Sequence, residues 1–152
     1  MTPDRQRPHI RSTVACVMQR GERFLMVEED RGGPVTLYNQ PAGHIEPGEG
    51  PMAATRREVR EETAWDITLD GYLGLYVFEL NGLTFHSHGF IASPVRFLDT
   101  PLDPDIHATH WLTLDEIRAL DAAGRMRSPQ VLPRIEAALA GRRFPLAMLH
   151  EN

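Results

Sequence analysis

The chain has 152 residues, of which 41% are hydrophobic and 24% are charged. This composition is typical of a globular protein and excludes a fibrous, disordered or membrane-spanning chain. The formal net charge of −5 gives no general attraction to nucleic acid or to anionic membranes, so we expect neither as a partner. The length fits one domain, and we treat residues 1–152 as a single domain.

The cysteine content and the start of the chain indicate a compartment. Cys16 is the single cysteine and has no partner for an intramolecular disulfide, which favours a reducing environment. Residues 1–9 are polar and lack an apolar run of signal-peptide length. No segment approaches the roughly 18 apolar residues that span a bilayer. We therefore expect a cytoplasmic protein.

The first part of the chain favours short strands followed by one helix. Residues 12–18 carry apolar side chains on both faces, as buried strands do, and residues 24–27 return as the second strand of a hairpin. Residues 37–45 are predicted to form short extended pieces joined by turns. Pro51 suits the first turn of a helix, and residues 52–63 are rich in good helix formers.

The rest of the chain alternates between strand and helix signals. Asn81-Gly82 is a strong signal for a β-hairpin, and a loop rich in Pro and Asp occupies residues 94–105. We predict strands at residues 72–80, 83–92 and 109–112, and helices at residues 114–122 and 131–140. Together these elements predict an α+β domain in which helices pack on a mixed sheet.

The predicted helix at residues 52–63 carries a cluster of carboxylates. At 100° per residue, Glu58, Glu61 and Glu62 fall within an arc of about 100°, so they project from one face. Many charged helix faces are simply solvated. Clustered carboxylate oxygens also suit a hard divalent cation, Mg²⁺ or Mn²⁺, that bridges to substrate phosphates. The spacing alone leaves both interpretations open.

A longer pattern surrounds this cluster. Gly43 is followed after five residues by Glu49 and, after seven more, by Arg57-Glu58 and the pair Glu61-Glu62. This resembles the Nudix box, Gly-x5-Glu-x7-Arg-Glu-U-x-Glu-Glu-x-Gly-U, where U is a bulky apolar residue. Every fixed position from Gly43 through Glu62 matches, and the spacing is long enough to make an accidental match improbable. Residues 43–65 are thus identified as a Nudix box.

Two positions at the end of the box depart from the family pattern. Ala64 stands where the family has glycine, and Trp65 replaces the usual aliphatic residue. A glycine there often ends the helix in a left-handed conformation. Alanine either adopts that conformation with strain or lets the helix end differently.

Segments outside the box resemble one subgroup of the family, the NudJ-type phosphatases, which act on nucleoside di- and triphosphates and on thiamine-type pyrophosphates. The resemblance rests on residues 38–44, Trp111, residues 127–129 and residues 144–146. It covers about residues 10–148.

The resemblance implies a fold and a chemistry. Nudix hydrolases fold as an α/β/α sandwich around a mixed sheet, and they use Mg²⁺ or Mn²⁺ to help water displace a group at phosphorus. Carried over to this chain, Glu58, Glu61 and Glu62 bind metal, together with the Gly43 carbonyl. Glu58 or Glu61 also orients or deprotonates the attacking water. Arg57 and Glu49 are expected to pair and to hold the loop against the helix.

Four further residues are candidates with competing interpretations. His44 and Arg127 are candidate contacts to substrate phosphates, although Arg127 also precedes Ser128, a helix-start residue. Asp103 and Asp105 are either an additional acidic metal ligand or plain loop-capping residues.

We therefore expect a metal-dependent hydrolase of nucleoside di- and triphosphates, with thiamine pyrophosphate as a further substrate, acting as a monomer or homodimer. One alternative is a Nudix pyrophosphatase for ADP-ribose, a dinucleoside polyphosphate or the 5′ end of RNA. Another is a non-catalytic, nucleotide-sensing Nudix module. The complete set of box glutamates argues against the sensor.

Overall fold

The computed structural model describes residues 9–151. The expected absence of a leader at the start of the chain concerns residues 1–8, which lie outside this range. The elements, in chain order, are β1 (Arg11–Arg20), β2 (Arg23–Glu29), β3 (Leu37–Asn39), β4 (Ala42–His44), α1 (Pro51–Thr63), β5 (Trp65–Leu80), β6 (Leu83–Phe97), β7 (Ile106–Thr113), α2 (Leu114–Ala122), α3 (Val131–Leu139) and the short 3₁₀ helix η1 (Leu146–Met148).

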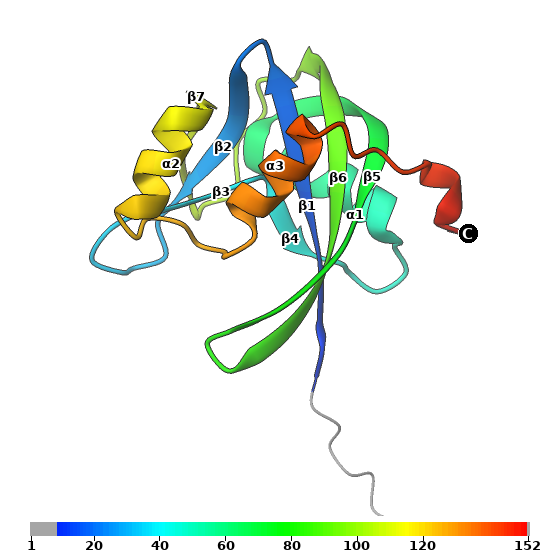
Figure 1. Cartoon of the computed structure of the whole chain (residues 1–152), viewed down its shortest axis with the longest axis horizontal. Helices are drawn as coiled ribbons and strands as arrows, with labels where there is room; N and C mark the ends of the chain where they lie inside the picture. Colours follow the sequence, from blue (N-terminus) through cyan, green and yellow to red (C-terminus); the bar gives the residue numbers. More distant parts are fainter. Residues whose placement is uncertain (1–8, 152) are drawn as a thin grey trace, which may run out of the picture.

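The strands form a mixed sheet of seven strands in which β1 is central (Figure 1). β1 runs parallel to β6, whereas all the other strand pairs are antiparallel. Along its other edge, β1 pairs first with β4 and then, at Gln19 and Arg20, with β2. β4 therefore lies next to β1, on the edge opposite β6.

Helices cover both faces of this sheet. Val14, Cys16 and Met18 of β1 point to the face that α1 covers, where they pack in one core with Ala54 and Val59. Val17 points to the opposite face, in a second core to which α2 and α3 contribute Ile117, Val131 and Ile135. Figure 1 shows α3 and α1 on opposite sides of the central strands. The predicted α/β/α sandwich is confirmed.

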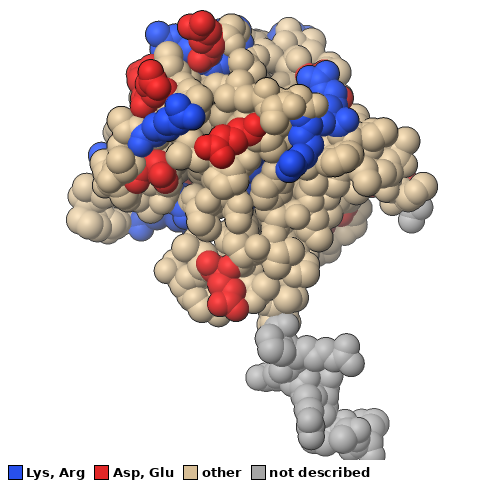
Figure 2. All heavy atoms as spheres, viewed as in Figure 1, with Lys and Arg blue, Asp and Glu red and all other residues tan. Residues whose placement is uncertain are grey.

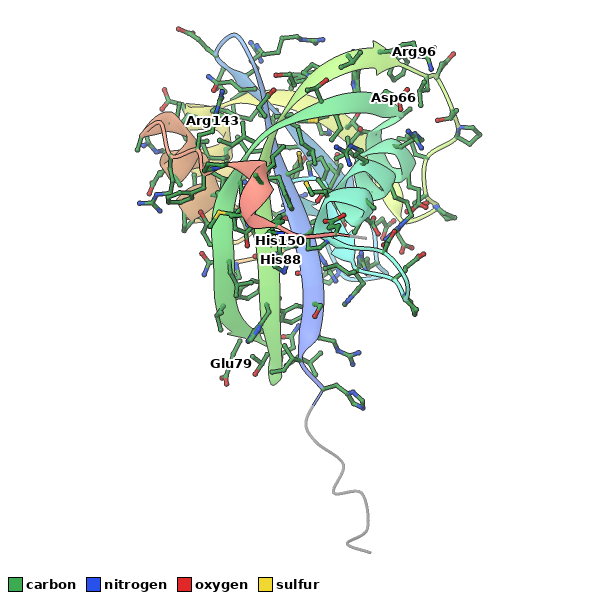
Figure 3. All side chains as sticks on the ribbon, turned by 90° about the vertical axis from the view of Figure 1, so that its right-hand side faces the viewer. Asp66, Glu79, His88, Arg96, Arg143 and His150 are labelled. Atoms are coloured by element: carbon green, nitrogen blue, oxygen red, sulfur yellow. The ribbon has the colours of Figure 1, made fainter. Side chains whose placement is uncertain are left out.

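The hairpin of β5 and β6 is longer than predicted, since β5 begins at Trp65 and β6 continues to Phe97. Its turn is the predicted one, with Asn81 and Gly82 at φ of 52° and 75°. The hairpin projects beyond the rest of the sheet (Figure 1), and Figure 3 shows Glu79 near its tip, far from α1. Phe78, Leu80 and Phe85 of this hairpin line a pocket of the site described below.

Two other predictions need correction in detail. The hairpin predicted between residues 12–18 and 24–27 contains only two residue pairs, because β2 diverges from β1 and pairs with β3 from Val27 onward, while its other edge pairs with β7 along its length. β7 starts at Ile106 and not at residue 109, since its pairing with β2 continues to Glu29. Both differences arise from pairing between strands that are distant in sequence, which local patterns do not report.

The end of α1 shows how Ala64 replaces the glycine of the family pattern. Ala64 adopts the left-handed conformation with φ of 60°, and its N–H donates to the Arg60 carbonyl. The helix therefore ends as it would with glycine, at the conformational cost of a Cβ in this region. Ala64 is 1% exposed, and the core around it holds it in place.

The surface seen in Figure 2 carries acidic and basic side chains in small separate groups, without a continuous basic face. Within residues 9–151, no helix has the length and apolar character needed to cross a membrane.

Candidate active site

The carboxylates of α1 open into a cleft beside β4. We call it the acidic cleft; its volume is about 310 Å³, and its lining includes Gly43, Arg57, Glu58, Glu61, Glu62, Asp103 and Asp105. α1 positions the glutamates because Ala54 and Val59, both fully buried, fix the helix in the core.

Three carboxylates in the acidic cleft lie close enough to share one cation. Glu58, Glu61 and Asp103 each offer an oxygen within 4.8 Å of the others. Asp103 is held there because its backbone N–H donates to the Glu61 carbonyl at 2.9 Å. Of the two aspartates considered from sequence, Asp103 therefore joins the group, and Asp105 lines the cleft nearby.

Glu62 stands apart from that group. Its side chain is buried, and its Oε1 accepts a hydrogen bond from the Ala42 N–H at 2.8 Å. Burial, opposed by this hydrogen bond, raises the pKa of Glu62 well above its usual range. Glu62 thus connects α1 to β4 and still contributes to the lining of the cleft.

Arg57 and Glu49 form the pair expected from the sequence pattern. Arg57 Nε donates to Glu49 Oε2 at 3.0 Å, and Nη2 donates to the His44 carbonyl at 2.9 Å. Nη1 donates to Glu58 at 2.8 Å and to Glu61 at 3.2 Å. One guanidinium therefore connects the loop, β4 and two of the clustered carboxylates.

The electrostatics of the cleft favour a cation. Burial, opposed by Arg57 and reinforced by the nearby charges of Glu61 and Asp103, raises the pKa of Glu58 to about 7. Carboxylates held this close repel one another unless a positive charge compensates them. A set of three carboxylate oxygens is the donor type that Mg²⁺ and Mn²⁺ prefer, so these residues fit such an ion.

Gly43 allows β4 to approach α1 closely. A Cβ built on Gly43 would overlap the Glu58 carboxylate. The backbone of β4 therefore lies against the acidic group, and only glycine leaves room for Glu58 at its present position.

A second, smaller pocket lies on the other side of β4. We call it the inner pocket; its volume is about 120 Å³, and its lining includes Val14, Glu29, Asn39, Phe78, Leu80, Phe85, Ser87, Arg127 and Arg134. Arg31, Ala42, Gly43 and His44 line both this pocket and the acidic cleft. The two spaces therefore meet along β4.

The two candidate substrate residues, His44 and Arg127, both line the inner pocket. His44 also lines the acidic cleft, and burial together with Arg11, Arg31 and Arg127 lowers its pKa. Arg127 lines the inner pocket, where its Nε lies 3.2 Å from Glu29 Oε2. A neutral imidazole and a guanidinium thus flank the passage between the two spaces.

Sequence reasoning missed most of the inner pocket. Its lining comes from the six strands β1 to β6 and from α3, so no local motif contains it. One signal was present: Arg134 follows Val131 by three residues and precedes Ile135, which places a charge on the apolar face of its helix.

Comparisons with known proteins agree with this geometry. The NUDIX domain family matches residues 8–135. The chain is 34% identical to Phosphatase NudJ of Escherichia coli K12 over 145 residues, which are 94% of this chain and 91% of that protein. A solved NUDIX hydrolase from Nitrosomonas europaea is 38% identical and superimposes with a TM-score of 0.90, covering 95% of this chain and 98% of the other. The Escherichia coli ORF135 protein, 24% identical with a TM-score of 0.67 over 89% of this chain and 92% of its own, shares the fold.

Proposed function

Because this chain belongs to the Nudix hydrolase family and acts on phosphoric anhydride bonds, we propose that it hydrolyses nucleoside di- and triphosphates with Mg²⁺ or Mn²⁺. The observation that carries the proposal is the group formed by Glu58, Glu61 and Asp103 at the mouth of the inner pocket. One space suits a cation with a diphosphate, and the other suits the group attached to that diphosphate.

In this proposal the clustered carboxylates hold the cation. Glu58, Glu61 and Asp103 are its proposed ligands; Glu62, which uses one oxygen for Ala42, and the Gly43 carbonyl are further candidates. When bound, such an ion neutralises phosphate charge and favours attack by water at phosphorus. Glu58 or Glu61 orients or deprotonates that water.

The remaining residues position these groups. Arg57 ties Glu58 and Glu61 to the loop through Glu49, so it limits the freedom of both carboxylates. His44 and Arg127 lie along the path from the acidic cleft into the inner pocket, where they contact the phosphates or the group beyond them. The water oxygen forms a bond to one phosphorus, the bridging P–O bond of the anhydride breaks, and its electron pair leaves with the departing phosphate, while Glu58 or Glu61 accepts the proton of the water and passes it to solvent.

Thiamine pyrophosphate is a second proposed substrate, because its diphosphate presents the same anhydride bond to the acidic cleft. Hydrolysis of ADP-ribose, a dinucleoside polyphosphate or an RNA 5′ end is the alternative within the family. The mixed surface charge in Figure 2 favours small substrates over an extended RNA chain. We propose a cytoplasmic enzyme that acts as a monomer or homodimer.

The decisive experiment is a product-resolved activity screen with purified protein in Mg²⁺, in Mn²⁺ and in EDTA. We expect orthophosphate or diphosphate from nucleoside di- and triphosphates with either ion, and no turnover in EDTA. Equal turnover with and without EDTA would contradict the metal proposal. Faster release of AMP from ADP-ribose than of any product from a nucleoside triphosphate would favour the alternative. Stabilisation by nucleotide without hydrolysis in either metal would point to a sensor.

A further inference from the structure

Arg134 of α3 is a buried charge without an acidic partner. It is 2% exposed, and none of the ion pairs found within residues 9–151 includes it. Its Nη1 donates to Gln40 Oε1 at 3.2 Å and its Nη2 to Ser87 Oγ at 2.8 Å, while its Nε has no partner. Because a guanidinium has five N–H groups, these two neutral acceptors leave most of its donor capacity unused.

The Tyr76 ring, whose centroid lies 5.3 Å from Arg134 Cζ, offers its face to the guanidinium, but no nearby carboxylate among the described residues supplies the missing negative charge. The inner pocket is lined by three arginines, Arg31, Arg127 and Arg134, and by one glutamate, Glu29. Glu29 lies within 3.2 Å of Arg127 and 3.5 Å of Arg31, so it is already shared between them. Burial of an uncompensated charge is costly. The net charge of the protein is −5, yet no carboxylate in the described part of the chain pairs with Arg134. A hydrogen-bond acceptor on a bound ligand would offset the cost of burying this guanidinium.

The opposite wall of the inner pocket is aromatic and aliphatic. Phe78 and Phe85 stack with ring centroids 5.2 Å apart and planes inclined by 6°, and Leu80, next to the turn of the hairpin, also lines the pocket. The inner pocket, at about 120 Å³, is open toward the acidic cleft along β4, and its apolar wall offers a surface on which one ring of a base can lie.

We propose that the inner pocket receives a nucleobase, and that Arg134 is a specificity-determining residue that donates to a ring carbonyl of that base. The proposal rests on the proposed function, since the diphosphate must lie in the acidic cleft for the ring to pass β4 into the inner pocket. Cytosine and uracil carry the required carbonyl at C2, and guanine carries one at C6. Adenine and the aminopyrimidine of thiamine have no ring carbonyl.

The test compares three diphosphates, UDP, CDP and ADP, in the wild type and in Arg134→Met. We expect the wild type to have a higher kcat/KM for UDP and CDP than for ADP. Arg134→Met should raise KM for UDP and CDP by about tenfold or more, as expected for loss of a charged hydrogen bond, with ADP nearly unchanged. Arg142→Met, exposed after α3, is the matched control and should change nothing.

A binding measurement separates recognition of the ring from catalysis. Calorimetry in EDTA with UMP and AMP should show tighter binding of UMP to the wild type, and Arg134→Met should remove the difference. Thermal unfolding checks that the variant is folded. If it is not, Arg134→Lys, which keeps the charge but loses the planar fork, replaces it and should reduce the same preference.

Three results would overturn the inference. Equal losses for UDP and ADP would make Arg134 a purely structural residue. An equally large loss for inorganic triphosphate would place a phosphate on Arg134 and not a base. A wild type that binds UMP and AMP equally would exclude ring selection. Absence of any nucleotide hydrolysis would instead contradict the proposed function, so the two failures are distinguishable.

Discussion

The acidic cleft and the inner pocket lie on either side of β4, yet they differ in almost every physical respect. The carboxylates of the cleft come mainly from one helix, and one guanidinium, Arg57, balances them. The inner pocket is assembled from seven elements, and the buried guanidinium of Arg134 in its wall has no carboxylate partner among residues 9–151. The cleft has more carboxylates than guanidinium groups, and Arg134 in the inner pocket lacks a charged acceptor, so a substrate with a cation-bound diphosphate and a ring carbonyl complements both.

The largest expected effect comes from removing a charge in the acidic cleft. Glu61→Gln keeps the shape of the side chain but removes one proposed ligand charge, and we expect kcat to fall by about 10³-fold or more. The measurement is steady-state hydrolysis at saturating Mg²⁺. Glu79→Gln, near the hairpin tip in Figure 3, is the control and should retain wild-type turnover. A loss confined to KM would assign Glu61 to substrate binding.

A substitution at the boundary between the two spaces should have the next largest effect. In Gly43→Ala the new Cβ would displace the Glu58 carboxylate, and we expect kcat to fall by about 10²-fold through misplacement of that group. Gly33→Ala is the matched control, because a Cβ there meets only ordinary van der Waals contact. Unchanged turnover in Gly43→Ala would show that Glu58 tolerates displacement.

Glu151, near the end of the chain, stabilises the first turn of α1. Gly50, the N-cap residue of α1, has no side chain, and Glu151 accepts instead from the Met52 N–H. Glu151→Ala should therefore lower the free energy of unfolding by about 1 kcal/mol. Chemical denaturation measures the change, with Glu136→Ala in exposed α3 sequence as the control. No destabilisation would mean that water replaces Glu151 at the cap.

The end of the same helix offers a change of opposite sign. Ala64 pays a conformational cost at φ of 60°, so Ala64→Gly should raise the free energy of unfolding by up to about 1 kcal/mol. The gain is partly offset because glycine has a more flexible unfolded state. Denaturation curves compare the variant with Ala53→Gly, an exposed position within α1 where glycine should destabilise. A less stable Ala64→Gly variant would show that packing of the Ala64 methyl dominates.

The smallest expected effect is a change in how stability depends on pH, caused by His88, which lies on the face of β6 opposite Ser87. His88 Nδ1 lies 2.7 Å from the Tyr72 hydroxyl, and burial lowers the pKa of His88, with Glu151 opposing and His86 reinforcing the shift. Between the ordinary histidine pKa of about 6.5 and the lower folded value, the unfolded chain binds more protons. The free energy of unfolding should therefore decrease as the pH falls through this window.

His88→Gln should make that decrease shallower, because it removes the group whose pKa differs between the two states. Melting temperatures at several pH values between 7.5 and 5 measure the slope, and His9→Gln at an exposed position is the control. An unchanged slope in His88→Gln would assign the pH dependence to other groups.

The sequence by itself determined the α1 carboxylates, their register and the family, because a helix converts fixed spacing into a shared face. It also determined the hairpin at Asn81-Gly82, since turn chemistry is local. Only the tertiary structure decided that Asp103 joins Glu58 and Glu61, and that Glu62 turns to Ala42. The inner pocket likewise depends on strand pairing and helix packing between distant residues. The charge of Arg134 was visible in the sequence, but its lack of a partner is a property of what surrounds it in space.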